Sequence, residues 1–321
     1  MNSLTSSTTG LGVAAGLCTA VLWTGTAVCF EAASKRLGSL AVNVLRLALA
    51  LVFFVALSLL RTHRLWAGDL SSQSWFYLGL SGVVGFVVGD VLLFQAFVLI
   101  GARLSMLIYA SVPFMTAIAG FVFLDERMSR RAVEGMAITV AGIALAVAGG
   151  RSPGAKDRGA RRVTGVLMAF GGAAGQAAGL LLGKRGALGL DSFAATQIRA
   201  FFGFAGFLLV AVAARQLGRI LGLVKVAVAP GGLVNGDRAR LRTLRFGLVV
   251  MAIGALLGPF LGVSLGLLST QLLPTGIAST LMSTVPVLLI PVSALSFRER
   301  ISLAEIGGAL LAVAGVAVLA Q

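Results

Sequence analysis

Residues 112–142 have the sequence VPFMTAIAGFVFLDERMSRRAVEGMAITVAG, and residues 285–315 have the sequence VPVLLIPVSALSFRERISLAEIGGALLAVAG. A shift of 173 residues aligns the two stretches without a gap and superposes Pro113 on Pro286, Glu126 on Glu299, Arg127 on Arg300 and Gly142 on Gly315. Both stretches contain an apolar segment with a proline, a short charged turn and a second apolar segment with spaced glycines. This repetition predicts two homologous halves.

The composition is typical of an integral membrane protein. Hydrophobic residues make up 58% of the 321 residues, charged residues make up 12%, and the mean hydropathy is +1.00. Apolar stretches of roughly 20 residues, long enough to cross a bilayer, recur along the whole chain. The net charge of +15 comes mainly from turns beside these stretches. We therefore assign it to membrane topology and to anionic headgroups, and we expect no nucleic-acid partner.

We expect an all-α fold with ten transmembrane helices, because a helix satisfies its own backbone hydrogen bonds in lipid. The expected spans are residues 11–33, 40–60, 76–99, 104–123, 132–149, 163–183, 193–213, 246–268, 275–296 and 304–320. The first repeat is expected at residues 1–150 and the second at residues 163–321, with a basic connecting loop at 151–162 and an inserted basic loop at 214–245.

The first two expected helices also have a copy, at a shift of 153 residues, which aligns Arg46 with Arg199. The repeat unit therefore contains five helices. An odd number of helices inverts the second copy relative to the first and predicts a pseudo-two-fold axis in the membrane plane. Lys and Arg concentrate in the loops 151–162 and 214–245, so the positive-inside rule places these loops in the cytoplasm and both termini outside.

Four ionisable residues within the apolar spans are candidates for a substrate site: Glu31, Arg46, Asp90 and Arg199. A charge at this depth is costly unless it is paired or faces a watery cavity. One interpretation is a binding site, and the other is a structural pair of Arg46 with Glu31 or Asp90. Arg199 differs from its equivalent Arg46 in having no such acidic partner, because Val263 occupies the position that corresponds to Asp90. We expect Arg199 to meet either Asp191 at the interface or a substrate carboxylate.

Other residues could line a cavity or shape the helices. The candidate lining residues are Trp23, Gln95, Tyr109 and Gln176. Pro113 and Pro286 are expected near the middle of their helices, where each would free a carbonyl or produce a kink. The turn residues Glu126, Arg127, Glu299 and Arg300 are expected to form hydrated caps at the helix ends. No catalytic constellation, metal cluster or phosphate-binding loop is present in the sequence, so we expect no enzyme activity and no cofactor or metal.

The doubled five-helix unit resembles the drug/metabolite transporter superfamily, and in particular its ten-helix EamA-type members. The resemblance rests on Trp23, the equivalent Arg46 and Arg199, residues 89–96 (GDVLLFQA) and the repeated proline-to-Glu-Arg pattern. It implies a multi-pass secondary transporter of the inner membrane with a central cavity between the halves. Members often have cytoplasmic termini, which is opposite to the orientation that the charge distribution predicts.

The resemblance leaves the substrate open. We expect export of small metabolites such as amino acids, with or without coupled protons, by a monomer or a homodimer in the bilayer. Efflux of cationic drugs is the alternative within transport, and a non-transporting membrane protein is the alternative outside it. An unpaired Asp90 in an aromatic cavity would favour cationic drugs, whereas Arg199 facing the cavity would favour a substrate with a carboxylate.

Overall fold

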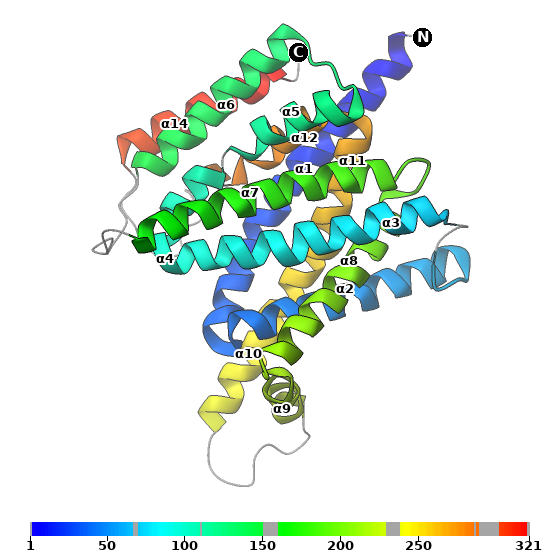
Figure 1. Cartoon of the computed structure of the whole chain (residues 1–321), viewed down its shortest axis with the longest axis vertical. Coiled ribbons are helices and arrows are strands. Elements are labelled where there is room, and N and C mark those ends of the chain that lie inside the picture. Colours follow the sequence, from blue (N-terminus) through cyan, green and yellow to red (C-terminus); the bar gives the residue numbers. More distant parts are fainter. Residues whose placement is uncertain are drawn as a thin grey trace.

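The computed structural model describes residues 2–66, 70–109, 111–149, 160–228, 238–285, 287–288 and 302–319. Within these ranges the chain forms helices and no strands (Figure 1). Pro286, Glu299 and Arg300 lie outside the described residues, as does most of the expected connecting loop at 151–162.

Helices of the first half follow one another with short connections. They are α1 (Asn2–Leu37), α2 (Ser39–Thr62), α3 (Ser72–Ser81), the π-helical segment η1 (Gly82–Gly89), α4 (Asp90–Tyr109), α5 (Val112–Leu124) and α6 (Arg130–Gly149). The second half contains α7 (Ala160–Gly186), α8 (Ser192–Ala213), α9 (Leu217–Val228), α10 (Arg238–Ala255), the π-helical segment η2 (Leu256–Gly262), α11 (Val263–Leu272), α12 (Thr275–Met282) and α14 (Leu303–Leu319). It follows the same order, with the additional helix α9 and with the stretch equivalent to α4 divided into α11 and α12. The counterpart of α5, residues 285–297, lies mostly outside the described residues.

Several helices have the length and composition of membrane spans. Among the described residues, six qualify: Thr8–Leu37, Ser39–Thr62, Ser72–Leu93, Val163–Gly186, Ser192–Ala213 and Leu241–Leu272. Two shorter apolar helices are also present, at Val112–Leu124 and Leu303–Val318. The chain is therefore an all-helical, multi-pass membrane protein.

Four features differ from the sequence-based expectation. In the second half, the expected span 275–296 is interrupted by a turn at residues 283–284, directly after α12. The other three lie elsewhere in the chain. Helix α4 continues through residues 100–103, where the third span was expected to end, and stops at Tyr109. Pro113 consequently lies in the first turn of α5 instead of mid-helix. Proline suits this position because an N–H in the first turn has no intrahelical acceptor and the fixed φ angle already matches the helix. The segment 214–245, expected as a loop, contains α9 and the first turns of α10.

Equivalent helices of the two halves pack against each other in antiparallel pairs. Helix α2 contacts α8, and α6 lies along α14 (Figure 1). The α6–α14 pair is the tightest: a Cβ added at Gly142 would lie 2.3 Å from the Ala312 nitrogen, and one added at Gly315 would lie 2.4 Å from the Thr139 nitrogen. These two contacts are related by the 173-residue shift. Only glycine permits this approach of two backbones at both places.

The two π-helical segments also occupy equivalent positions in the repeat. Segment η1 packs against α7 and α8 of the second half, and η2 packs against α1 and α2 of the first half. Pro259 lies inside η2, where it lacks an N–H and its ring crowds the preceding turn. Segment η1 has Phe86 at the corresponding position and still adopts the π-helical form. Such wide turns are often found at functional sites, so the junction of η1 and η2 with the opposite halves is the place to look for one.

Candidate functional site

Trp23 and Gln176 lie at equivalent places beside the two π-helical segments. A Cβ added at Gly89, the end of η1, would lie 3.5 Å from the Gln176 backbone nitrogen. A Cβ added at Gly262, the end of η2, would lie 3.1 Å from Trp23 Nε1. The two residues are 153 positions apart, which is the shift that relates the first helices of the halves. Each residue therefore contributes to one half of a junction that both repeats build together.

Arg46 and Asp90 form a buried ion pair at this junction. Arg46 Nη2 donates a hydrogen bond to Asp90 Oδ2. The Arg46 side chain is 4% exposed and that of Asp90 is 21% exposed. The Arg46 guanidinium carbon also lies 5.3 Å from the centroid of the Phe30 ring. The pairing neutralises two charges that would be expensive apart, and it leaves part of the Asp90 side chain accessible.

Arg199 is buried to the same degree as Arg46 but has no carboxylate beside it. No acidic side chain of the described residues pairs with it, and its Nε atom lacks an acceptor. Its guanidinium carbon lies 5.5 Å from the centroid of the Phe86 ring, in a niche formed by the backbones of Gly85 and Gly183. The expected contact with Asp191 is absent, because that carboxylate accepts hydrogen bonds from the first amides of α8.

The remaining candidate residues are more dispersed. Tyr109 is half-buried and lies within electrostatic range of Asp90. Gln95 is exposed on the surface of α4. The side chain of Glu31 is outside the described part of the chain. We define the central site as Arg46, Asp90, Arg199, Trp23 and Gln176, all of which lie where the halves meet.

Comparison with known proteins identifies the family. The profile of the EamA-like transporter family matches residues 10–148 and again residues 163–321. The chain belongs to this family. It is therefore a membrane transporter of the drug/metabolite transporter superfamily, and its two matched segments are duplicated halves. The family is not enzymatic.

The fold has a precedent among solved structures. One protein, described only as "Crystal structure of protein", is 20% identical and superposes with a TM-score of 0.67. The alignment covers 96% of this chain and 94% of that one, so the two proteins share the whole fold. No curated protein matches the sequence.

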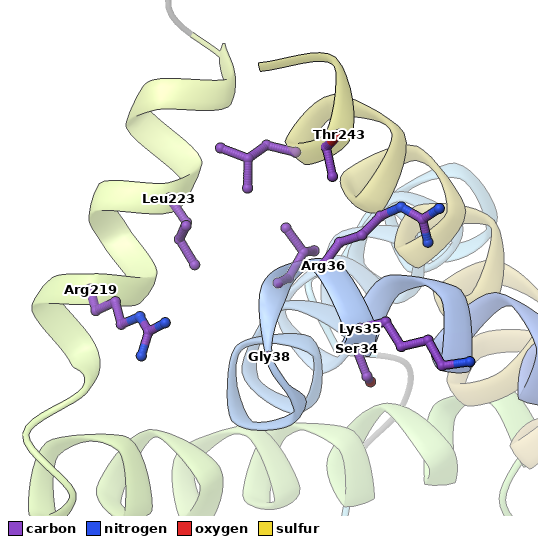
Figure 2. Close-up of a pocket in the computed structure, with 9 residues that line it drawn as sticks. Ser34, Lys35, Arg36, Gly38, Arg219, Leu223 and Thr243 are labelled. Carbon is purple, nitrogen blue, oxygen red and sulfur yellow. The ribbon is translucent and has the colours of Figure 1, made fainter. Parts of the chain in front are cut away.

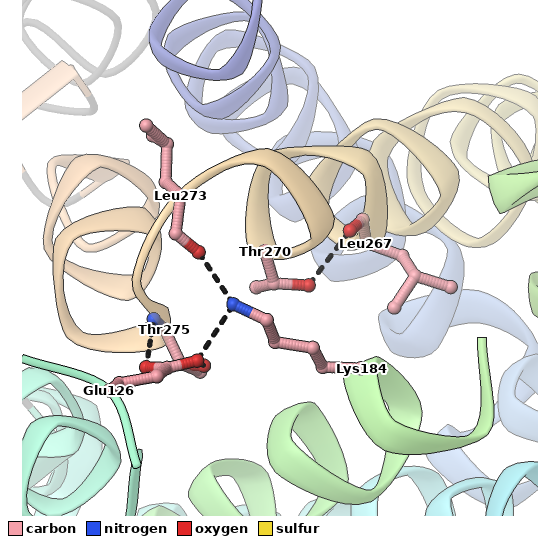
Figure 3. Close-up of polar contacts among 6 residues, drawn as sticks. All are labelled: Glu126, Lys184, Leu267, Thr270, Leu273 and Thr275. Atoms are coloured by element: carbon pink, nitrogen blue, oxygen red, sulfur yellow. Dashed lines mark hydrogen bonds and ion pairs between the residues drawn. The ribbon is translucent and has the colours of Figure 1, made fainter. Parts of the chain in front are cut away.

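A second polar group of this EamA-like transporter was not foreseen from the sequence. Glu126, Lys184, Leu273 and Thr275 form what we call the Glu126 cluster (Figure 3). Glu126 accepts hydrogen bonds from the Thr275 backbone nitrogen at 2.6 Å and from the Thr275 hydroxyl at 2.8 Å. Lys184 Nζ lies 2.7 Å from a Glu126 carboxylate oxygen and donates to the Leu273 carbonyl at 2.7 Å. The cluster thus connects the turn after α5 in the first half with α7, with the residue that follows α11 and with the start of α12 in the second half.

The Glu126 cluster exists because α12 begins without a cap of its own. Pro274 occupies the capping position and offers no side-chain acceptor, so the first amide of α12 needs one from elsewhere. Glu126 supplies it, and the carboxylate also suits the positive end of the helix dipole. The Glu126 side chain is only 11% exposed, so the expected hydrated cap is wrong for this residue. Arg127 is exposed as expected.

One sequence signal for this cluster was available. Proline is common at the start of a helix, so Pro274 indicates that a helix begins near residue 275. That signal predicts an uncapped amide group but does not identify the residue that satisfies it. Glu126 lies 149 positions away, and only the fold brings the two together.

Proposed function

We propose that this EamA-like transporter is a secondary carrier of the inner membrane that exports small, carboxylate-bearing metabolites such as amino acids. It does so by alternating access between two inverted five-helix repeats, with ten transmembrane helices in all. The antiparallel packing of α2 with α8 and of α6 with α14 supports the inversion. An axis along the membrane normal would leave equivalent spanning helices parallel, whereas an axis in the membrane plane makes them antiparallel.

The buried, unpaired Arg199 is the observation that carries the proposed substrate class. A cation at this depth is costly unless an anion offsets its desolvation. The planar guanidinium binds a carboxylate through two parallel hydrogen bonds, which matches a substrate that carries this group. Arg199 also lies against η1 of the other half, so a rocking movement between the halves would change its surroundings.

The Arg46–Asp90 pair supports a carboxylate substrate over a cationic drug. Arg46 already neutralises Asp90, so a cationic drug would have to compete with a guanidinium that is hydrogen-bonded in place. The partly exposed Asp90 can still accept a hydrogen bond from the ammonium group of an amino acid. Asp90 thus suits the ammonium group of such a substrate, and Arg199 suits its carboxylate.

We assign the closed end of the transport pathway to the Glu126 cluster. It joins the halves through an ion pair and two hydrogen bonds to one carboxylate. Alternating access requires the contacts at one end to separate while those at the other end form. Charged and polar contacts suit this task, because water replaces them at a modest net cost when the end opens.

The decisive experiment is transport by the purified protein in proteoliposomes. A panel of radiolabelled amino acids and other carboxylates, together with fluorescent cationic dyes, is tested on the wild type, Arg199→Gln, Arg199→Lys and the surface control Arg130→Gln. We expect carboxylate transport that falls at least about tenfold in Arg199→Gln, because a hydrogen bond to a charged group contributes about 1.5–3 kcal/mol. Arg199→Lys should retain part of it, and Arg130→Gln all of it.

Two results would reject the proposal. The first is dye transport without carboxylate transport, which would indicate drug efflux. The second is full carboxylate transport by a folded Arg199→Gln protein, which would leave Arg199 a packing residue.

A further inference from the structure

A pocket of about 500 Å³ lies at one end of the helix bundle, where α1 ends, α10 begins and α9 passes alongside (Figure 2). It is separate from the central site and from the Glu126 cluster. Three basic residues line it, namely Lys35, Arg36 and Arg219, and none of its described lining residues is acidic. The hydroxyl residues Ser34 and Thr243 complete its polar lining. Arg36 and Arg219 give this lining a positive charge that favours an anion.

Arg219 is positioned by the amphipathic helix α9. Ile220 is buried in the core, and Leu223 and Val226 pack against the same core cluster. Arg219 lies one turn before Leu223 on the same side of α9, is exposed, and reaches toward the turn at Gly38 (Figure 2). No acidic side chain of the described chain pairs with Arg219.

The turn at Gly38 adds a second source of positive potential. Gly38 has a φ angle of 90°, which lets the chain reverse between α1 and α2 and which other residues rarely adopt. Helix α2 begins directly after it, at Ser39, and no side chain caps its first amides. An uncapped helix N-terminus carries partial positive charge and binds anions. A guanidinium and a helix N-terminus lining the same pocket repel each other unless an anion lies between them.

The other side of the pocket holds its groups in fixed positions. Arg36 donates to the Ala32 carbonyl at 2.6 Å, and its guanidinium carbon lies 4.7 Å from the centroid of the Phe246 ring. The apolar side chains of Leu37, Leu223 and Leu244 form the rest of the lining. Polar, cationic and apolar groups thus meet in one pocket, as they do where a phospholipid headgroup joins its acyl chains.

We propose that this pocket binds the phosphate group of an anionic phospholipid at the membrane surface. The pocket is built from the α1–α2 turn and the insertion around α9, two of the basic connections that the positive-inside rule assigns to the cytoplasmic side. Anionic lipids are enriched on that side. The proposal is independent of the transported substrate, because no residue of the pocket belongs to the central site.

Native mass spectrometry of the full-length protein released from nanodiscs tests this proposal. The nanodiscs contain phosphatidylglycerol, phosphatidylcholine or an equal mixture, and inorganic phosphate is offered separately to protein in detergent. The pocket variant is Arg36→Gln with Arg219→Gln. The matched control is Arg215→Gln with Lys225→Gln, which removes the same charge from the same region outside the pocket lining. Melting temperatures of both variants verify folding, and Arg219→Glu alone provides a second, milder pocket variant.

We expect the wild type and the control to retain phosphatidylglycerol in preference to phosphatidylcholine. The pocket variant should retain it about 20-fold less, because each basic residue near an anionic surface contributes roughly a fivefold gain in affinity. Arg219→Glu should lose retention as well. Equal losses in pocket and control variants would overturn the proposal in favour of a general charge effect. Binding of inorganic phosphate without retention of lipid would overturn it in favour of a soluble anion.

Discussion

Arg46 and Arg199 occupy the same position in the two repeats, and their surroundings differ by one carboxylate. Each lies eight residues into its helix, α2 or α8, and each is 4% exposed. Arg46 is bonded to Asp90, whereas Val263 stands at the corresponding place in the second half. The backbone is duplicated but the charge is not. We infer that the repeat builds the frame and that the difference between the halves determines what the frame binds.

The π-helical segments lead to a related conclusion about the backbone. The contact of Gly85 with Gly179 in one half corresponds to the contact of Gly258 with Thr26 in the other. Both halves thus keep a close helix–helix approach at this position, although the facing residue is glycine in one half and threonine in the other. Pro259 explains the wide turn of η2, but η1 forms one without a proline. The packing of each segment between two helices of the opposite half is the feature common to both.

The largest effect is expected from breaking the first-half pair. Arg46→Leu leaves Asp90 buried without its cation, which should lower the free energy of unfolding by about 3–5 kcal/mol. The double variant Arg46→Leu with Asp90→Leu should recover most of this loss. Thermal unfolding in detergent, followed by size-exclusion chromatography, measures both. If the double variant is as unstable as the single one, the pair is not the source of the effect.

A smaller loss is expected at the α6–α14 contact, where the two halves should behave alike. Gly142→Ala and Gly315→Ala each place a methyl group within 2.4 Å of a backbone nitrogen of the facing helix. Each should lower the free energy of unfolding by about 1–3 kcal/mol. The control is Gly307→Ala, because nothing lies within 4 Å of that Cβ, and it should be neutral or slightly stabilising. Unequal losses for the two equivalent glycines would show that the two sides of this contact are not equivalent in energy.

The Glu126 cluster should show a measurable coupling between the halves. Glu126→Gln and Lys184→Met should each reduce the free energy of unfolding by about 1–2 kcal/mol, because each leaves a partly buried group with fewer partners. A double-mutant cycle should give a coupling of about 1 kcal/mol. The same variants should change the rate of transport if this contact opens in each cycle. Additive effects on stability would mean that the ion pair contributes nothing beyond its separate parts.

The smallest effect on stability is expected from making the second half resemble the first. Val263→Asp places a carboxylate at the position equivalent to Asp90, where we expect it to pair with Arg199. The free energy of unfolding should change by only about 1 kcal/mol, because the cost of burying the acid is offset by the pairing. Transport should fall at least about tenfold, since Arg199 is then no longer available. The control is Val263→Asn. Asparagine has the same shape as aspartate but no charge, so this variant should retain more transport than Val263→Asp.

The main architecture could be predicted from the sequence because it rests on local and repeated features. Apolar segments of membrane length require helices in lipid, and the shifts of 173 and 153 residues relate the halves. The equivalence of Arg46 and Arg199 followed from the same alignment. The position of Pro113 within its helix could not be predicted in this way. Helix α4 extends to Tyr109, so the next helix begins only at Val112 and Pro113 lies in its first turn.

The choice of partner for each charged group was decided by the tertiary structure alone. Arg46 could have paired with Glu31 or Asp90, and the fold brings Asp90 to it across 44 positions. Glu126 was expected in water and instead caps a helix of the other half. The physical reason is the same in both cases. Apolar periodicity is encoded along a segment, whereas a hydrogen bond or ion pair depends on which segments meet, at what depth and with which groups left unsatisfied.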